Sequence, residues 1–175
     1  MPVDPEMIAL RQQVAALGAT VQRLADAAEI AALIASYGPA VDCGASAAAA
    51  ALWSEEGAYD LGPLGTARGQ AQIAALFDGD MHRSLIAGGA AHLLGPPQIE
   101  VEGDTATAVG HSCVARWSGD RFELFRVAAN RWRLVRTSNG WRVASRENRL
   151  LNGSTEAQSL LDIAGKGSAE SGAAS

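Results

Sequence analysis

Two polar residues that stand alone in apolar stretches are the first candidates for chemistry in this chain. Asp42 is the only charged residue in the stretch 30–54, where alanine predominates. His92 is the only titratable side chain in the stretch 84–99, which is rich in Ala, Gly and Leu. Burial of an isolated carboxylate costs free energy unless a partner compensates it. The two residues are therefore candidates for a pair that transfers protons.

A paired histidine and aspartate would suit general-base chemistry at neutral pH. A neutral imidazole has a reference pKa of about 6.5, and a carboxylate that accepts its other N–H fixes the tautomer and stabilises the imidazolium. Such a pair can abstract a proton from carbon before water or halide leaves, and no cofactor is required. Each residue also has a structural alternative. Asp42 could cap the helix predicted from Ser46, and His92 could be a satisfied polar residue at the start of a strand.

Other function classes find little support in the sequence. The segment Gly110-His-Ser-Cys-Val lacks the final glycine of a nucleophile elbow, and no HExxH, Cys-x-x-Cys or Gly-rich nucleotide motif occurs. We therefore expect no metal and no cofactor. The 175-residue chain has a formal net charge of −5 and no dense run of Lys or Arg, so nucleic acid is not an expected partner. Cys43 and Cys113 suggest reduced thiols, and His82 is expected to be solvated in a polar loop.

A long N-terminal helix is predicted for residues 5–37, ending or bending at Gly38-Pro39. Its first part carries a heptad seam, in which apolar residues are spaced 3, 4, 3, 4 and 3 apart: Met7, Leu10, Val14, Leu17, Val21 and Leu24. We expect residues 1–23 to form a helix apart from the main domain, with the seam packed on another chain or along its own domain. The same register is expected to continue into residues 25–37.

The rest of the chain is predicted to hold short helices followed by strands. Helices are expected over residues 46–53 and 70–77, with a short strand near 58–61 between them. Strands are expected over residues 97–101, 105–117, 121–136 and 141–148, with a hairpin turn at Asn139-Gly140. Helices before a run of antiparallel strands indicate an α+β fold, in which a curved sheet wraps around the helices. We expect this domain to span residues 24–163 and residues 164–175 to form a disordered tail.

Neither export nor membrane insertion is expected. The N-terminus lacks a basic segment followed by an apolar core, which is the pattern of a signal peptide. The apolar stretch 30–53 is interrupted by Asp42, Gly38, Pro39 and Gly44, so it is a poor candidate for a membrane span. We therefore expect a cytoplasmic protein with no membrane partner.

Five segments carry a resemblance to a known superfamily. They are Ile34-Ala-Ser-Tyr37-Gly-Pro-Ala-Val-Asp42, Trp53-Ser-Glu-Glu-Gly-Ala-Tyr59-Asp60, Gly69-Gln-Ala-Gln-Ile73, Ile99-Glu-Val-Glu-Gly-Asp-Thr-Ala106 and Arg136-Thr-Ser-Asn-Gly-Trp141-Arg-Val. In this order and spacing they resemble the SnoaL-like branch of the NTF2-like superfamily. The resemblance implies a cone-shaped α+β fold in which a curved antiparallel sheet encloses an apolar pocket, here with an extra N-terminal helix.

The resemblance also implies roles for particular residues. Scytalone dehydratase, hexachlorocyclohexane dehydrochlorinase and bile-acid 7α-dehydratase resemble one another in using an Asp at the end of the first helix to orient a His on the sheet. Asp42 matches that Asp and His92 matches that His, which implies catalytic roles for both. Val41 stands where scytalone dehydratase has a tyrosine, so the substrate and the binding of water are expected to differ.

A second group of residues is expected to bind substrate. His111 resembles a second histidine of scytalone dehydratase, and Asn130 falls near a substrate-binding asparagine of that enzyme. Tyr59 resembles one of its water-positioning tyrosines, and Tyr37 and Trp53 are further candidates for the pocket wall. Strand alternation leaves open whether His111 faces the pocket or the other side of the sheet.

The expected function is that of a cofactor-independent lyase, of the dehydratase or dehydrohalogenase type, acting on a hydrophobic cyclic or polycyclic substrate. An isomerase or polyketide cyclase using the same base is one alternative, and a non-catalytic small-molecule-binding protein is another. The heptad seam and the habit of the superfamily suggest a homo-oligomer, for which the dehydratase branch favours a trimer over a dimer.

Overall fold

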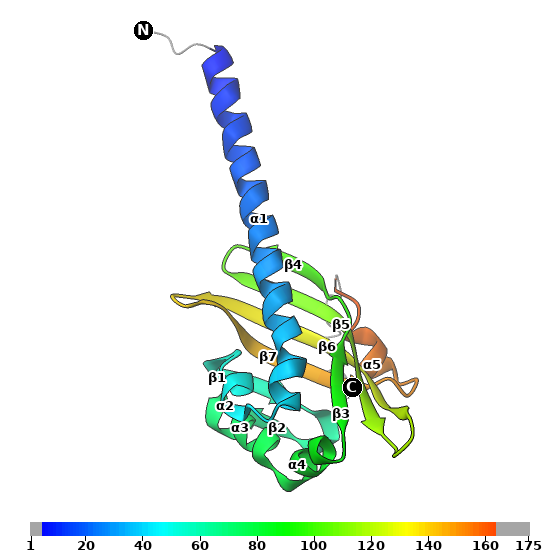
Figure 1. The fold of residues 1–175 in the computed structure, drawn as a ribbon. Coiled ribbons are helices and arrows are strands. Elements are labelled where there is room, and N and C mark those ends of the chain that lie inside the picture. Colours follow the sequence, from blue (N-terminus) through cyan, green and yellow to red (C-terminus); the bar gives the residue numbers. More distant parts are fainter. Residues whose placement is uncertain (1–4, 164–175) are drawn as a thin grey trace, which may run out of the picture.

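A curved seven-stranded sheet packs against the C-terminal half of one long helix, whose N-terminal half projects from the domain (Figure 1). The structure is a computed structural model and describes residues 5–163. The helices are α1 (Pro5–Asp42), α2 (Ser46–Ala50), α3 (Gly69–Asp78), α4 (Asp80–Ala87) and α5 (Thr155–Ser159), with a 3₁₀ turn η1 (Gly62–Leu64). The strands are β1 (Trp53–Asp60), β2 (Thr66–Arg68), β3 (Ala90–Leu94), β4 (Gln98–Glu102), β5 (Thr105–Trp117), β6 (Phe122–Thr137) and β7 (Gly140–Leu150).

The α+β fold expected from the sequence is confirmed, but the sheet is mixed rather than antiparallel. Its strand order is β2-β1-β7-β6-β5-β3, and β4 also pairs with β5. Strands β1 and β7 run parallel, whereas the other pairs are antiparallel. The parallel pair arises because the first and last strands of the sheet meet without a hairpin between them. Local pattern cannot reveal the direction of such a distant pairing.

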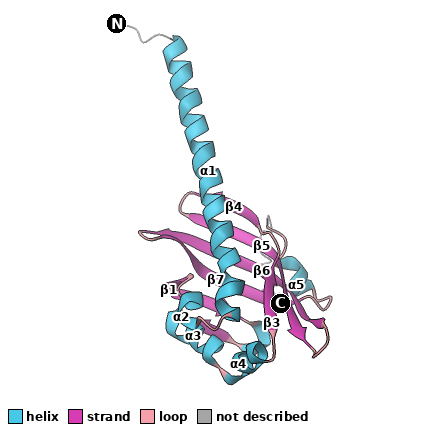
Figure 2. Cartoon of the chain, viewed as in Figure 1, coloured by secondary structure: helices cyan, strands magenta, loops and turns pink. Residues whose placement is uncertain are grey.

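The core lies between α1 and the concave face of the sheet, with α2, α3 and α4 closing one end (Figure 2). Helix α1 contributes buried positions at the spacing of one helical face: Ile30, Ile34, Tyr37 and Val41. They contact a layer of tryptophans and aliphatic residues from the strands: Trp53, Trp132, Leu134, Trp141 and Val143. This contact fixes where the C-terminal end of α1 lies on the sheet.

Helix α1 does not end at Gly38-Pro39 as expected, but continues to Asp42 with the proline inside it. The backbone N–H of Cys43 donates to the carbonyl oxygen of Pro39 at 3.1 Å, so helical hydrogen bonding resumes after the proline. Gly38 is buried against β3, where a Cβ atom would overlap the backbone carbonyl oxygen of His92. The glycine therefore permits a close approach of helix and strand, and the extra turn carries Asp42 to the sheet.

The middle of α1 is anchored to the sheet by a buried carboxylate. Asp26 accepts hydrogen bonds from the Arg136 guanidinium at 2.7 Å and from the Trp141 indole N–H at 3.3 Å. The hydrogen bond from Arg136 is the main cause that lowers the pKa of Asp26 to about 2. Asp26 therefore stays ionised across the neutral range and marks the point where α1 enters the domain.

The heptad seam projects beyond the domain and is exposed in this single chain. Its six residues are between 46% and 66% exposed: Met7, Leu10, Val14, Leu17, Val21 and Leu24. The expected continuation of this register is wrong, because the buried residues of α1, such as Ile30 and Ile34, lie on the opposite side of the helix. The seam and the core face therefore belong to two separate surfaces. The expected tail over residues 164–175 lies outside the described residues.

Helix α1 also meets the length and composition expected of a membrane-spanning helix, and it is the only helix to do so among residues 5–163. A third of the relevant window, 33%, is buried inside the domain. The core helix of a soluble protein meets the same criteria, so this finding is weak support for a membrane helix.

Candidate active site

Asp42 and His92, which are 50 residues apart in the sequence, are joined by two hydrogen bonds. The His92 ring nitrogen Nδ1 lies 2.6 Å from Asp42 Oδ1, and the His92 backbone N–H donates to Oδ2 at 2.8 Å. The side chains are only 14% and 25% exposed for His92 and Asp42 respectively. With Asp42 ionised, Nδ1 carries the hydrogen of the neutral ring and Nε2 keeps its lone pair.

The elements that position this pair follow from local features of the sequence. Asp42 is the last residue of α1, so its side chain is held where the helix ends against β3. His92 is the middle residue of β3 and pairs with Val114 of β5, which fixes the direction of its side chain. The close approach at Gly38 completes the arrangement, because that residue packs directly on the His92 backbone.

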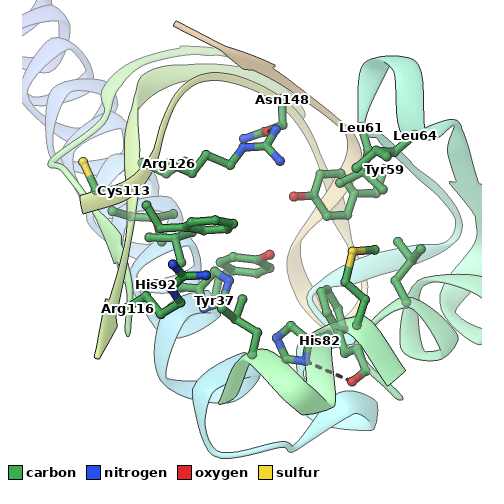
Figure 3. Close-up of a pocket in the computed structure, with 18 of the residues that line it drawn as sticks. Tyr37, Tyr59, Leu61, Leu64, His82, His92, Cys113, Arg116, Arg126 and Asn148 are labelled. Atoms are coloured by element: carbon green, nitrogen blue, oxygen red, sulfur yellow. Dashed lines mark hydrogen bonds between the residues drawn. The ribbon is translucent and has the colours of Figure 1, made fainter. Parts of the chain in front are cut away.

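His92 lines a cavity of about 630 Å³ between the sheet and the short helices (Figure 3). Its apolar wall comes from η1, α3, α4 and the residues near them: Leu61, Leu64, Leu76, Phe77 and Leu85. The volume lies within the range of sites for drug-sized ligands. The cavity is therefore large enough for a hydrophobic ring system in reach of the imidazole.

The hydroxyl groups of Tyr37 and Tyr59 both point into the cavity (Figure 3). Both side chains are otherwise buried, with exposed fractions of 4% and 5%. Burial raises the pKa of the Tyr59 phenol well above its ordinary value, so the group stays protonated and can donate a hydrogen bond. The two candidates from the sequence thus lie where a ligand oxygen would meet them.

A buried arginine that the sequence interpretation missed also lines the cavity. The guanidinium carbon of Arg146 lies 4.2 Å from the ring centres of Tyr37 and Trp132 and 4.7 Å from that of Tyr59. Its Nε and Nη2 donate to the Asn130 side-chain oxygen at 3.0 and 2.8 Å. Its Nη1 is buried without a hydrogen-bond partner among residues 5–163. The aromatic faces hold the charge in place by cation–π interactions, and Nη1 is the guanidinium nitrogen that no hydrogen bond among residues 5–163 satisfies.

Asn130 lies behind this arginine and does not line the cavity, contrary to its expected role as a ligand to substrate. It is 1% exposed and organises a network of polar side chains. Its amide nitrogen donates to the Ser112 hydroxyl at 2.9 Å, and its oxygen accepts from Asn148 at 2.8 Å as well as from Arg146. Arg126 in turn donates to the Asn148 oxygen at 2.6 Å. Asn130 therefore positions residues of the cavity rather than touching its contents.

Two further candidates for substrate binding lie outside the cavity. His111 is exposed on β5, because its neighbour Ser112 and the alternate residue Val114 take the cavity side of the strand. Trp53 is fully buried, with its ring centre 6.2 Å from that of Tyr37 and 5.5 Å from that of Tyr59. It supports the two tyrosines from behind, and His111 has no direct access to a ligand in the cavity.

The expectation that His82 is solvated in a polar loop is wrong. His82 is half-buried on α4 and lines the cavity. Its Nδ1 lies 3.0 Å from the carbonyl oxygen of Phe77, and its ring centre lies 5.6 Å from that of His92 (Figure 3). Burial lowers the pKa of His82, and its Nε2 has no hydrogen-bond partner among residues 5–163. A second imidazole therefore stands beside that of His92.

Comparisons with known proteins agree with this architecture. A family model described as a SnoaL-like domain matches residues 22–147. An NTF2-like protein with a cystatin-like fold from Novosphingobium aromaticivorans is 51% identical, with 83% of this chain and 95% of that chain covered and a TM-score of 0.82. ActVI-ORFA from Streptomyces coelicolor is 23% identical over 71% of this chain and 96% of its own, with a TM-score of 0.63, which shows similarity of fold alone. No curated protein matches the chain.

Proposed function

Because the chain belongs to the SnoaL-like family of NTF2-like proteins, whose shared fold hosts many chemistries, we propose its function from the cavity itself. The proposed activity is that of a cofactor-independent lyase acting on a hydrophobic cyclic or polycyclic substrate. One observation carries this proposal: the hydrogen-bonded pair of Asp42 and His92 at the wall of an apolar cavity. Among residues 5–163, no group of three or more His, Cys, Asp or Glu side chains is arranged to hold a metal ion.

In the proposed reaction, His92 Nε2 takes a proton from a carbon atom of the substrate. The electron pair of that C–H bond forms a carbon–carbon double bond, and the adjacent C–O or C–halogen bond breaks as hydroxide or halide departs. Asp42 stabilises the imidazolium and keeps the ring in the correct tautomer. A departing hydroxide takes the proton back from the His92 imidazolium and leaves as water, which restores the neutral base; when halide departs, the imidazolium gives its proton to solvent water.

The other polar groups of the cavity are placed to stabilise charge on the substrate. Tyr37 and Tyr59 present hydroxyl groups to the cavity, and the unpartnered Nη1 of Arg146 offers a further donor. Donors fixed in a water-poor site stabilise a developing negative charge more strongly than water does. We assign them to a carbonyl oxygen or to the leaving group of the substrate.

A second candidate function is an isomerase or cyclase that uses the same base. The position of His82 favours it, because an isomerase must return a proton and a second imidazole lies beside His92. In that reaction the proton taken by His92 is delivered to another atom of the same substrate, so the mass of the substrate is unchanged.

Product analysis in heavy water distinguishes these functions. A panel of cyclic hydroxy-ketones and halogenated rings is incubated with the protein in D₂O, and the products are analysed by mass spectrometry. A lyase gives products that have lost water or hydrogen halide. An isomerase gives products that differ only in incorporated deuterium. If compounds bind in the cavity but neither lose mass nor exchange any C–H group, both the lyase and the isomerase functions are contradicted. A non-catalytic binding protein would then be the remaining interpretation.

A further inference from the structure

Within residues 5–163, the lining of the cavity is positively charged and contains no carboxylate. Arg116, Arg126 and Arg146 line it, whereas no Asp or Glu is among the described residues that do. Elsewhere in the sheet, Arg136 and Arg149 each pair with two carboxylates. The three arginines of the cavity form no ion pair among residues 5–163. The described part of the cavity therefore carries three positive side chains and no carboxylate, in a protein whose formal net charge is −5.

In Figure 3, Arg116 lies beside His92, whereas Arg126, Asn148 and Tyr59 lie at the end of the cavity away from His92. There the half-buried Arg126 guanidinium lies beside Asn148, and the Tyr59 hydroxyl points towards the same space. Arg146 supplies the buried Nη1 that has no partner among residues 5–163. An oxyanion matches this set, because hydrogen bonds between charged partners are the strongest that such donors form.

The carboxylate of Asp42 is not among the residues that line the cavity, and its ion pair is with His92 rather than with any of the three arginines. Both of its oxygens accept hydrogen bonds from His92, one from the ring and one from the backbone. When its partner ring is protonated during the proposed reaction, the lining becomes more positive still. A ligand that brings its own negative charge would therefore be favoured over a neutral one of the same shape.

We propose that the natural ligand is an amphipathic anion, namely a hydrophobic ring system that carries a carboxylate or an equivalent oxyanion held by Arg126. The rings lie against the aliphatic wall and the oxyanion lies at the arginine end. This inference rests on the proposed function in one respect: the ligand and the proposed substrate share the same cavity. Binding of the anion does not depend on whether the protein catalyses a reaction.

A matched pair of fluorescent probes tests the proposal. 1-Anilinonaphthalene-8-sulfonate and N-phenyl-1-naphthylamine share their ring systems but differ in one sulfonate group. The sulfonate probe is expected to bind roughly ten- to a hundred-fold more tightly than the neutral probe. Arg126→Met should remove most of this preference, and Arg126→Lys should retain part of it. Arg133→Met is the matched control, because Arg133 lies on the same strand but is exposed outside the cavity.

The outcomes separate this inference from the proposed chemistry. Equal affinities for the two probes, tighter binding of the neutral probe, or binding of neither would overturn the anion site. The anion site would also be overturned if Arg126→Met and Arg133→Met reduced the preference for the sulfonate probe to the same extent. A preference for the sulfonate probe in a protein that shows no elimination or exchange would leave the anion site standing and contradict only the proposed reaction. Near-ultraviolet circular dichroism of each variant shows whether it has folded.

A second inference concerns the exposed heptad seam of α1. Its residues lie on the side of the helix opposite to the face that packs in the domain, so a second helix can lie along the seam without displacing the sheet. Residues 7–24 span roughly 27 Å at about 1.5 Å per residue. The 3-4 spacing is the pattern by which helices pair in a coiled coil.

The residue types at the seam indicate how many chains meet and in which direction. Val14 and Val21 occupy two of the a positions, whereas the d positions are leucines, a combination that favours two strands. Glu6 and Arg11 occupy g and e positions five residues apart, so in a parallel pair each Glu6 faces Arg11 of the other copy. We propose that a second copy of this chain covers the seam as a parallel two-stranded coiled coil, rather than the trimer that the family resemblance implies.

Light scattering and cysteine crosslinking test this assembly. Over micromolar concentrations the protein should be a dimer, and Leu17→Glu should give a monomer. Ala19→Glu adds the same charge two residues away, off the seam, and should stay a dimer. With Cys43→Ser and Cys113→Ser in the background, Met7→Cys should form a disulfide between chains, because only a parallel pair brings the two positions together.

Three results would contradict the coiled coil. A wild-type monomer would show that the seam does not pair, and a trimer would show that the number of chains is wrong. A dimer that persists in Leu17→Glu would show that another surface holds the chains together. Failure of Met7→Cys to crosslink in a protein that is dimeric by light scattering would exclude the parallel arrangement.

Discussion

Replacement of His92 with alanine is expected to lower kcat by about 10²–10⁴-fold, because the substitution removes the proposed base from the cavity. Asp42→Asn should cause a loss of the same order. Its amide group can donate to His92 Nδ1, which places the ring hydrogen on Nε2 and leaves no lone pair towards the substrate. Both losses are measured as initial rates on the substrate that product analysis identifies.

The matched control for this prediction is His111→Ala, which removes an exposed imidazole outside the cavity and should change kcat by less than about two-fold. If His92→Ala and Asp42→Asn keep activity within a few-fold of the wild type, the proposed base is wrong. An equal loss in His111→Ala would point instead to a general requirement for histidine that the cavity does not explain.

The second large effect is expected from Gly38→Ala. This substitution should lower both the free energy of unfolding and the turnover of the proposed reaction. Gly38→Ala places a Cβ atom against the carbonyl oxygen of His92, so α1 must move away from β3 or the strand must bend. Such overpacking typically costs about 1–3 kcal/mol in the free energy of unfolding. The displacement also lengthens both hydrogen bonds between Asp42 and His92, so turnover should fall further than the loss of stability explains.

Urea unfolding measures the first of these effects, and Gly18→Ala in the same helix provides the control. Apart from the chain neighbours of Gly18 and the backbone of its own helix, nothing lies within 4 Å of the place that a Cβ atom would take, so alanine there meets no obstacle. It should raise the free energy of unfolding by up to about 1 kcal/mol, because alanine favours the helix. Equal effects of the two substitutions would show that α1 and β3 are not in such close contact.

Much of the architecture could be predicted from the sequence. The strand expected over 105–117 coincides with β5, and those expected over 121–136 and 141–148 fall within one or two residues of β6 and β7. These strands could be predicted because the alternation of apolar residues and the turn residues are local signals in the sequence. The proximity of Asp42 and His92 came from the family resemblance and from their isolation in apolar stretches, since spacing alone cannot bring residues 50 positions apart together.

Arg146 was missed because a bulge reverses the alternation of its strand. Trp141 and Val143 are buried, so strict alternation would place Arg146 on the outer face. The register of β6 against β7 shifts where Leu134 pairs with Val143 and Arg133 with Ser145, which leaves Ala144 unpaired. The extra residue turns Arg146 inward. No local sequence pattern predicts this shift in register, because a bulge depends on the pairing with the partner strand.

His82 was placed in a loop for a related reason. The segment around it is polar and includes Asp78, Gly79 and Asp80, which suggests a turn when taken alone. In the structure Gly79 separates two helices, and α4 turns the imidazole towards the cavity. Phe77 at the end of α3 packs on the imidazole, with the two ring centres 5.6 Å apart, and this contact helps to bury it. The parts of the site that depend on such distant packing lay beyond sequence reasoning.

The tautomer of His92 tests the proposed role of the pair most directly, and it can be measured before any substrate is known. A long-range proton–nitrogen NMR spectrum of the neutral ring should show hydrogen on Nδ1 and a bare Nε2 in the wild type. In Asp42→Asn the hydrogen should move towards Nε2. A wild-type ring that carries its hydrogen on Nε2 would contradict the proposed mechanism, because His92 would then have no lone pair to offer the cavity.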